Sequence, residues 1–257
     1  MKCRLALLFA LASWTSAVAD TAVLTPSKDN TIYFTSDNLS NGSGQHLFAG
    51  TSGIAQRQRA LLAFAVADST ASDATVTSVR PTLNMPRTSS NAHTIALHRV
   101  LANWSEGTSA ATGAGSGEGN GGAPSSSDAT WAHTFFDTAT WSTPGGDFAA
   151  DTSAVLTVDA VGAYSWESTP QLVADVQTWL DDPASNFGWI LIGNETTSGT
   201  SKRFDSRQHE DPTAHPFLTV EFDADDTPAL VGDFDADGNV GFQDFFVFAD
   251  HFGTNAN

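Results

Sequence analysis

The stretch Leu218-Thr219-Val220-Glu221-Phe222 alternates apolar and polar side chains, a period of two that is typical of a β-strand with one buried and one wet face. Large apolar residues also recur at every second position earlier in the chain. Leu62, Phe64 and Val66 alternate with Ala63 and Ala65, Leu83 and Met85 flank Asn84, and Ile95 and Leu97 flank Ala96. The run from Gly188 to Gly193, GWILIG, is apolar on both faces, as expected of a central strand. Short strands separated by turns rich in Thr, Ser and Gly predict a mainly β fold, an antiparallel jelly-roll-type β-sandwich.

One helix is expected among the strands. Thr169 is placed to cap it, and Pro170 suits its first position. An apolar stripe follows at helical spacing, formed by Leu172, Val173, Val176, Trp179 and Leu180. Asp182-Pro183 ends the pattern. We therefore expect one short helix laid across an edge or end of the sandwich.

The N-terminus has the three parts of a secretory signal peptide. A basic beginning precedes an apolar run from Leu5 to Trp14, and Ala17-Val18-Ala19 offers a small-residue cleavage site. We expect residues 1–19 to be removed before Asp20 and the protein to be secreted. Cys3 would leave with that segment, so the mature chain would have no disulfide and no thiol chemistry. No second long apolar run follows, so the sequence predicts no membrane insertion.

The charge balance is strongly negative. Eleven basic residues stand against 29 acidic ones, a net charge of −18, and loss of Lys2 and Arg4 with the signal peptide would leave nine basic residues and −20. Such a surface repels phosphate backbones and anionic lipids, which argues against nucleic acids and membranes as partners. It also argues against polyanionic glycans, unless the few arginines gather on one face.

The remaining chain divides into a β-domain and a short C-terminal segment. The β-domain is expected to span residues 20–222, followed by an acidic, Pro-containing linker at 223–231 and the C-terminal segment at 232–257. Within the β-domain, residues 107–130 are a low-complexity run of Gly, Ser and Ala, which predicts a long loop or insertion.

The C-terminal segment begins with the pattern of an EF-hand-type calcium loop, GDFDADGNVGFQD at residues 232–244. Gly238 permits the sharp turn, and Gln243 to Phe252 suits a short exiting helix. The alternative is a solvated acidic linker. The expected Ca²⁺ ligands are the oxygens of Asp233, Asp235, Asp237, Asn239 and Asp244.

An aspartate at the last ligand position has a shorter reach than glutamate, which weakens the preference for calcium over magnesium. It is also what bacterial dockerin segments have, and the run resembles their DxDxDGxxxxxD pattern followed by a helix. Dockerins normally carry two such segments, whereas one is visible here. A protein partner for the C-terminal segment is therefore an open expectation.

The sequence shows no recognisable catalytic motif. It has no GxSxG elbow, HExxH helix or phosphate-binding GKS/T loop. Among 29 acids some pair can meet the spacing that a glycosidase needs, and Glu106 and Glu195 are the first candidates. The alternative for both is a turn or edge carboxylate. The seven histidines are scattered without ligand spacing: His46, His93, His98, His133, His209, His215 and His251.

Candidates for sugar binding are easier to find. Proteins bind sugars with flat aromatic faces and planar polar groups. Three tryptophans lie in polar, loop-like surroundings, and two arginines precede the last strand: Trp131, Trp141, Trp166, Arg203 and Arg207. The alternatives are partial burial for the tryptophans and structural ion pairs for the arginines.

Six short segments carry a resemblance to a known family. They are Lys28–Tyr33, Gln58–Phe64, Trp104–Gly107, Val176–Trp179, Asn186–Trp189 and Lys202–Arg207. In this order, over most of residues 20–223, they resemble the DNRLRE family of secreted bacterial domains. The resemblance implies a jelly-roll β-sandwich of carbohydrate-binding-module type, often attached to polysaccharide-degrading enzymes or cell-surface proteins. Some relatives bind acidic polysaccharides through basic residues.

The sequence thus predicts a secreted, non-catalytic polysaccharide-binding module with a calcium-binding, dockerin-like C-terminal segment. Two alternatives stay open. One is a polysaccharide-degrading hydrolase or lyase, and the other is a structural protein of the cell surface or matrix.

Overall fold

The computed structural model describes residues 19–70, 73–111, 117–223, 232 and 240–251. The chain divides into two units, one from Asp20 to Ala224 and one that includes the C-terminal segment, and each is described by itself. The expected signal peptide (up to residue 18) and the linker (from residue 224) lie outside the described residues.

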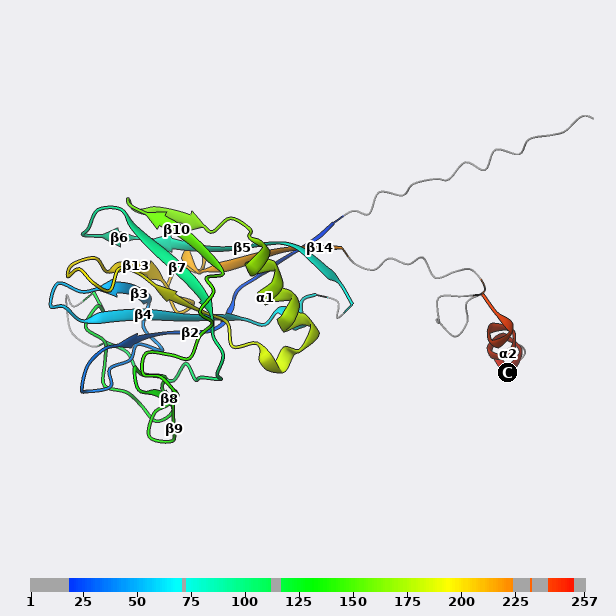
Figure 1. Cartoon of the computed structure of the whole chain (residues 1–257), viewed down its shortest axis with the longest axis horizontal. Helices are drawn as coiled ribbons and strands as arrows, with labels where there is room; N and C mark the ends of the chain where they lie inside the picture. The colour runs from blue at the N-terminus through cyan, green and yellow to red at the C-terminus, as the bar shows by residue number, and fades with distance from the viewer. Residues whose placement is uncertain (1–18, 71–72, 112–116, 224–231, 233–239, 252–257) are drawn as a thin grey trace, which may run out of the picture. The chain divides into compact units, whose positions relative to one another are not determined.

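The first unit is mainly antiparallel β-structure (Figure 1). Its strands are β1 (Asp20–Leu24), β2 (Pro26–Tyr33), β3 (His46–Thr51), β4 (Arg57–Phe64), β5 (Thr75–Met85), β6 (Arg87–Thr88), β7 (His93–Arg99), β8 (His133–Phe135), β9 (Ala139–Thr140), β10 (Ala154–Val158), β11 (Gly162–Ser165), β12 (Trp189–Ile192), β13 (Lys202–Asp205) and β14 (Phe217–Asp223). The described α-helices are α1 (Pro170–Asp181) and, in the second unit, α2 (Phe242–His251).

The strands form two main sheets. The smaller has the order β1-β14-β5-β11, and the larger, a curled half-barrel, has the order β10-β7-β12-β4-β3-β13-β6 with β2 also paired to β4. Strands β8 and β9 form a separate hairpin. Neighbours in the sheets come from distant parts of the sequence, so the order of the strands had to come from the structure.

The main core lies between the two sheets. Leu218 and Val220 of β14 are fully buried against residues of the larger sheet such as Leu62, Ile95 and Leu191. Each side chain of this size contributes about 1.5–3 kcal/mol when it leaves water. The predicted alternation at 218–222 is confirmed, because Thr219 and Glu221 are only half-buried.

Strand β12 and the second half of β4 are buried on both faces; this was predicted for the uniformly apolar β12, whereas the β4 region was predicted from its period-2 pattern. A second apolar cluster covers their other face, and Leu61 and Ile190 belong to it. Residues of the segment that follows β7 complete this cluster, among them Trp104, Trp131 and Trp141. Strand β4 ends at Phe64, so Val66, which fitted the strand pattern, lies in a short 3₁₀ turn instead.

Helix α1 forms where its sequence predicted. The Thr169 hydroxyl accepts a hydrogen bond from the Leu172 amide at 3.0 Å and caps the first turn. The apolar stripe, including Val176 and Trp179, is buried, and the helix packs against β5 (Figure 1). Asp175 is also buried on this face, where Trp189 donates to it at 2.9 Å.

Candidate functional site

Three side chains form a row across the outer end of the larger sheet. Arg203 of β13 lies directly opposite Phe48 of β3 on one side and Arg87 of β6 on the other. Residues opposite one another in a ladder point to the same face of the sheet. Because Phe204 points into the core, the row faces outward.

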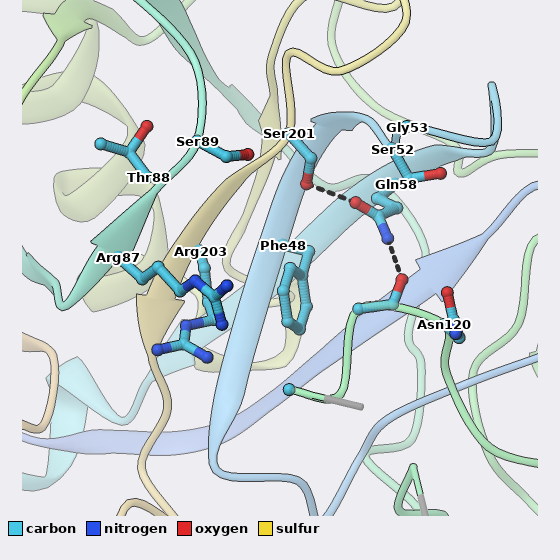
Figure 2. Close-up of a pocket in the computed structure, with 12 residues that line it drawn as sticks. Phe48, Ser52, Gly53, Gln58, Arg87, Thr88, Ser89, Asn120, Ser201 and Arg203 are labelled. Carbon is cyan, nitrogen blue, oxygen red and sulfur yellow. Dashed lines mark hydrogen bonds between the residues drawn. The ribbon is translucent and has the colours of Figure 1, made fainter. Parts of the chain in front are cut away.

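This row lines a pocket of about 290 Å³, which we call the arginine pocket (Figure 2). In Figure 2 the guanidinium groups of Arg87 and Arg203 lie together beside the ring of Phe48. The pocket wall is completed by Gln58, Ser201 and the loop residues Gly117, Gly119 and Asn120. The volume is near the lower end for a small-molecule site, which suits a single unit of a longer ligand.

The two arginines hold two positive charges close together. A Cβ atom added to Gly117 would lie 3.4 Å from Nη1 of Arg203 and 3.9 Å from Nη1 of Arg87, so both groups reach the same point. Burial, followed by repulsion from Arg87, lowers the pKa of Arg203, although Asp205 and Glu118 oppose this. Within the described ranges, neither arginine forms an ion pair, and the buried Nε of Arg203 has no hydrogen-bond partner. Like charges held together in this way favour binding of an anion.

The polar side of the pocket is held rigidly. Gln58 is almost fully buried; its side-chain oxygen accepts from the Ser201 hydroxyl, and its Nε2 donates to the carbonyl of Gly119 (Figure 2). Asn120 is exposed at the mouth. The exposed amide of Asn120 could therefore bond to sugar hydroxyls, whereas the amide of Gln58 is already engaged.

The loop that closes the pocket comes from the Gly- and Ser-rich stretch at 107–130. Burial would raise the pKa of Glu118, but hydrogen bonds from the His46 side chain, the Gln45 amide and the Asn41 side chain outweigh it and lower that pKa to about 2. The carboxylate therefore stays charged and ties the loop to the start of β3. The described parts of the stretch, 107–111 and 117–130, are loop, as predicted, but the C-terminal end is not peripheral, because Asp128 is fully buried.

The next row of the same sheet brings together two histidines and an acid. Asp205 of β13 lies opposite His46 of β3, and His209 follows in the turn after β13. The Oδ1 atom of Asp205 lies 3.5 Å from Nε2 of His46 and 3.6 Å from Nε2 of His209. Sequence spacing gave no sign of such a cluster. We call these three residues the His–Asp cluster.

The three tryptophans predicted as sugar contacts point inward. Trp131, Trp141 and Trp166 are only 6%, 3% and 0% exposed. The indole nitrogens of Trp141 and Trp166 donate to the carbonyls of Thr130 and Ile95, at 2.9 and 3.3 Å. The Trp131 ring is contacted by the side chains of Phe34 and Arg59. The structure does not bring these tryptophans together with the arginine pocket.

The two predicted arginines have different surroundings. Arg203 lines the pocket, whereas Arg207 is engaged by Glu106 in a two-pronged ion pair, with Nε–Oε1 at 2.7 Å and Nη2–Oε2 at 2.9 Å. Glu195, the other acid singled out as a catalytic candidate, forms the same kind of pair with Arg59, at 2.6 and 2.8 Å. Both carboxylates thus serve as fixed partners of arginines.

Four of the five predicted calcium ligands, Asp233, Asp235, Asp237 and Asn239, lie outside the described residues. Asp244 is described and is 3% exposed. Its Oδ2 accepts from the amide of Gly241 at 2.6 Å, which satisfies a free backbone donor just before α2. The helix begins at Phe242, one residue before the position predicted from the sequence.

No protein-family model matches this chain, and no curated protein matches it either. Over the described part of the chain, no helix has the length and apolar character needed to cross a bilayer.

Sequence reasoning missed most of the arginine pocket. Phe48 and Arg87 carry no motif of their own, and Gln58 was noted as part of the segment Gln58–Phe64 but not as a site residue. One signal was available, because Glu118 and Asn120 stand out as large polar residues in a run of Gly, Ser and Ala. A glycine-rich loop that retains such residues indicates a backbone that must approach other groups closely.

Proposed function

We propose that this protein is a secreted, non-catalytic module that binds an acidic polysaccharide through the arginine pocket. The observation that carries the proposal is the adjacent pair Arg87 and Arg203, which has no carboxylate partner among the described residues and lies beside Phe48. The ligand class is a sugar chain whose units bear carboxylate or sulfate groups.

The chemistry of the pocket matches such a ligand. Guanidinium groups bind carboxylates and sulfates through paired hydrogen bonds, and these are strong when partly shielded from water. An anion between Arg87 and Arg203 would also remove the repulsion between them. The accessible part of the Phe48 ring and the exposed amide of Asn120 would then contact the C–H face and the hydroxyls of the same sugar unit.

The overall negative charge is compatible with this ligand class. The acidic residues set the long-range potential, but screening limits their effect to about 8 Å at physiological ionic strength. The pocket brings two of the few basic residues together. Arginines gathered on one face are the arrangement in which a negative net charge does not argue against a polyanionic glycan. Binding is expected to be salt-sensitive and of modest affinity.

The remaining features of the proposal come from the sequence. The segments shared with DNRLRE domains support a jelly-roll topology for the β-sandwich and membership of that group of modules. The signal-peptide pattern of residues 1–19 supports export. The EF-hand-type pattern supports Ca²⁺ binding by Asp233, Asp235, Asp237, Asn239 and Asp244, and the exposed rings of Phe242, Phe245 and Phe246 on α2 support a protein partner for the C-terminal segment.

A polysaccharide panel tests this function. The purified protein is incubated with uronic-acid, sulfated and neutral polysaccharides, and binding is followed by affinity electrophoresis. Retardation by acidic but not neutral chains supports the proposal, whereas retardation by neutral chains alone would contradict it. The same incubations are examined for new reducing ends and unsaturated sugars, and turnover there would favour a hydrolase or lyase instead.

A further inference from the structure

The His–Asp cluster has the geometry of a metal site. Oδ1 of Asp205 and one ring nitrogen each of His46 and His209 all lie within 4.8 Å of one another. His46 and His209 lie far apart in the sequence. The antiparallel pairing of β3 with β13 brings them to the same carboxylate. Three donor atoms therefore converge on one point.

The central carboxylate lacks a partner at the atom that faces this point. Asp205 is fully buried, and its Oδ1 atom has no hydrogen-bond partner. Its other oxygen accepts from Nδ2 of Asn84 at 2.6 Å, which fixes the orientation of the group. A buried carboxylate oxygen without a hydrogen bond is costly, so a cation at this position would be strongly stabilising.

Both histidines are supported from behind. Nδ1 of His46 lies 3.3 Å from Oε2 of Glu118, so a proton on Nδ1 leaves the lone pair of Nε2 directed at the cluster. The Asp211 amide lies 3.2 Å from Nδ1 of His209 and can donate to it, and the Asp211 carbonyl oxygen lies 3.4 Å from the same atom; a ring bound to metal through Nε2 would instead carry its proton on Nδ1 and donate to that carbonyl. Metal-bound histidines are commonly held in this way by a carboxylate or a carbonyl behind the ring.

We propose that His46, Asp205 and His209 bind a divalent transition-metal ion of the zinc type. With bonds of about 2.0–2.1 Å, a tetrahedral ion places its ligands roughly 3.3 Å apart, close to the 3.5 and 3.6 Å between Asp205 Oδ1 and the two imidazoles. Two imidazoles and one carboxylate favour zinc over calcium, which prefers oxygen donors. The ion would leave one position for water and would tie β3 to the turn after β13.

Zinc binding is measured by calorimetry on the full chain in excess calcium, which saturates the predicted EF-hand-type loop. The native chain is expected to bind one additional zinc ion. His46→Gln and His209→Gln are expected to abolish this binding, and Glu118→Gln to weaken it roughly 10–100-fold. His93→Gln, on β7, is the matched control and should bind like the native chain.

Cobalt provides a second readout on the native chain, which does not depend on whether the variants fold. Bound to two imidazoles and one carboxylate in a four-coordinate site, Co²⁺ gives intense visible absorption, whereas in an all-oxygen loop it gives weak bands. Intense bands that zinc displaces support the site. Absence of zinc binding and of these bands in the native chain, or full zinc affinity in both folded histidine variants, would overturn it.

Discussion

Arg203 and Asp205 project from the same face of β13, two residues apart, and ions of opposite charge would stabilise them. Arg203 lies beside a second arginine without a carboxylate partner, and Asp205 turns a bare carboxylate oxygen toward two imidazoles. Glu118 lies 3.3 Å from His46 Nδ1 and acts electrostatically on Arg203. One strand thus carries residues of both the proposed anion site and the proposed metal site.

Asp29 makes the stability of the fold depend on pH. Its side chain is fully buried, and burial is the main cause that raises its pKa to about 8, partly opposed by a hydrogen bond from the Arg207 amide at 2.7 Å. Since the pKa of Asp29 is raised in the folded state, the protonated carboxyl contributes to stability. This contribution is complete below the ordinary pKa near 3.8 and is lost as pH rises through about 8.

The test is Asp29→Asn, which keeps the shape and the acceptor for the Arg207 amide. Between pH 5 and pH 7.5, native stability relative to the variant should fall by about 1.4 kcal/mol per pH unit. Urea unfolding of both proteins across this range measures the difference. Parallel pH profiles would show that Asp29 does not carry the effect.

Trp166 is expected to stabilise the core and not to bind sugar. Its ring is fully buried near Phe204, with centroids 6.3 Å apart. Trp166→Ala should therefore lower the free energy of unfolding by about 3–5 kcal/mol, and Trp166→Phe should cost less. Under conditions where Trp166→Phe is folded, its affinity for the polysaccharide should equal that of the native chain. A stable variant that no longer binds would reverse this assignment.

The C-terminal segment is expected to bind calcium with a dissociation constant of about 10⁻⁵ to 10⁻³ M, near the range of extracellular modules. Asp235→Ala removes one ligand carboxylate and should weaken binding by at least tenfold, while Asp226→Ala, in the linker, should leave it unchanged. Titration calorimetry with Ca²⁺ compares the three proteins. Absence of heat in the native chain, or equal affinities in all three, would argue for a solvated acidic segment.

Local sequence patterns were sufficient to predict the helix and several strands, but not to predict the candidate functional sites. The alternation at Leu218–Phe222 and the cap at Thr169 each depend on a few neighbouring residues, and both were predicted from the sequence. The arginine pocket depends on the register between β3, β13 and β6, which sequence periodicity does not specify. The polar sequence neighbours of Trp131 suggested a sugar contact, but they lie in a loop that packs over the central strands.

The His–Asp cluster was hidden in the same way. His46 and His209 lie far apart in the sequence and follow no ligand spacing, and only the pairing of Asp205 with His46 brings them together. Glu118 stands out from its Gly, Ser and Ala neighbours, but a run without periodic pattern gives no basis for predicting which residues it contacts.

The central claim is that the arginine pocket binds an acidic sugar chain. The most direct test compares Arg203→Gln with Arg80→Gln, because Arg80 is an exposed arginine of β5 paired with Glu167 at 3.5 Å, and its loss changes the net charge equally. Affinities for the acidic polysaccharide that the native chain binds best are measured by calorimetry at two salt concentrations. We predict that Arg203→Gln weakens binding by tenfold or more, as loss of a charged hydrogen bond worth about 1.5–3 kcal/mol implies, and that Arg80→Gln leaves it within twofold. Equal affinities for the two folded variants would contradict the account.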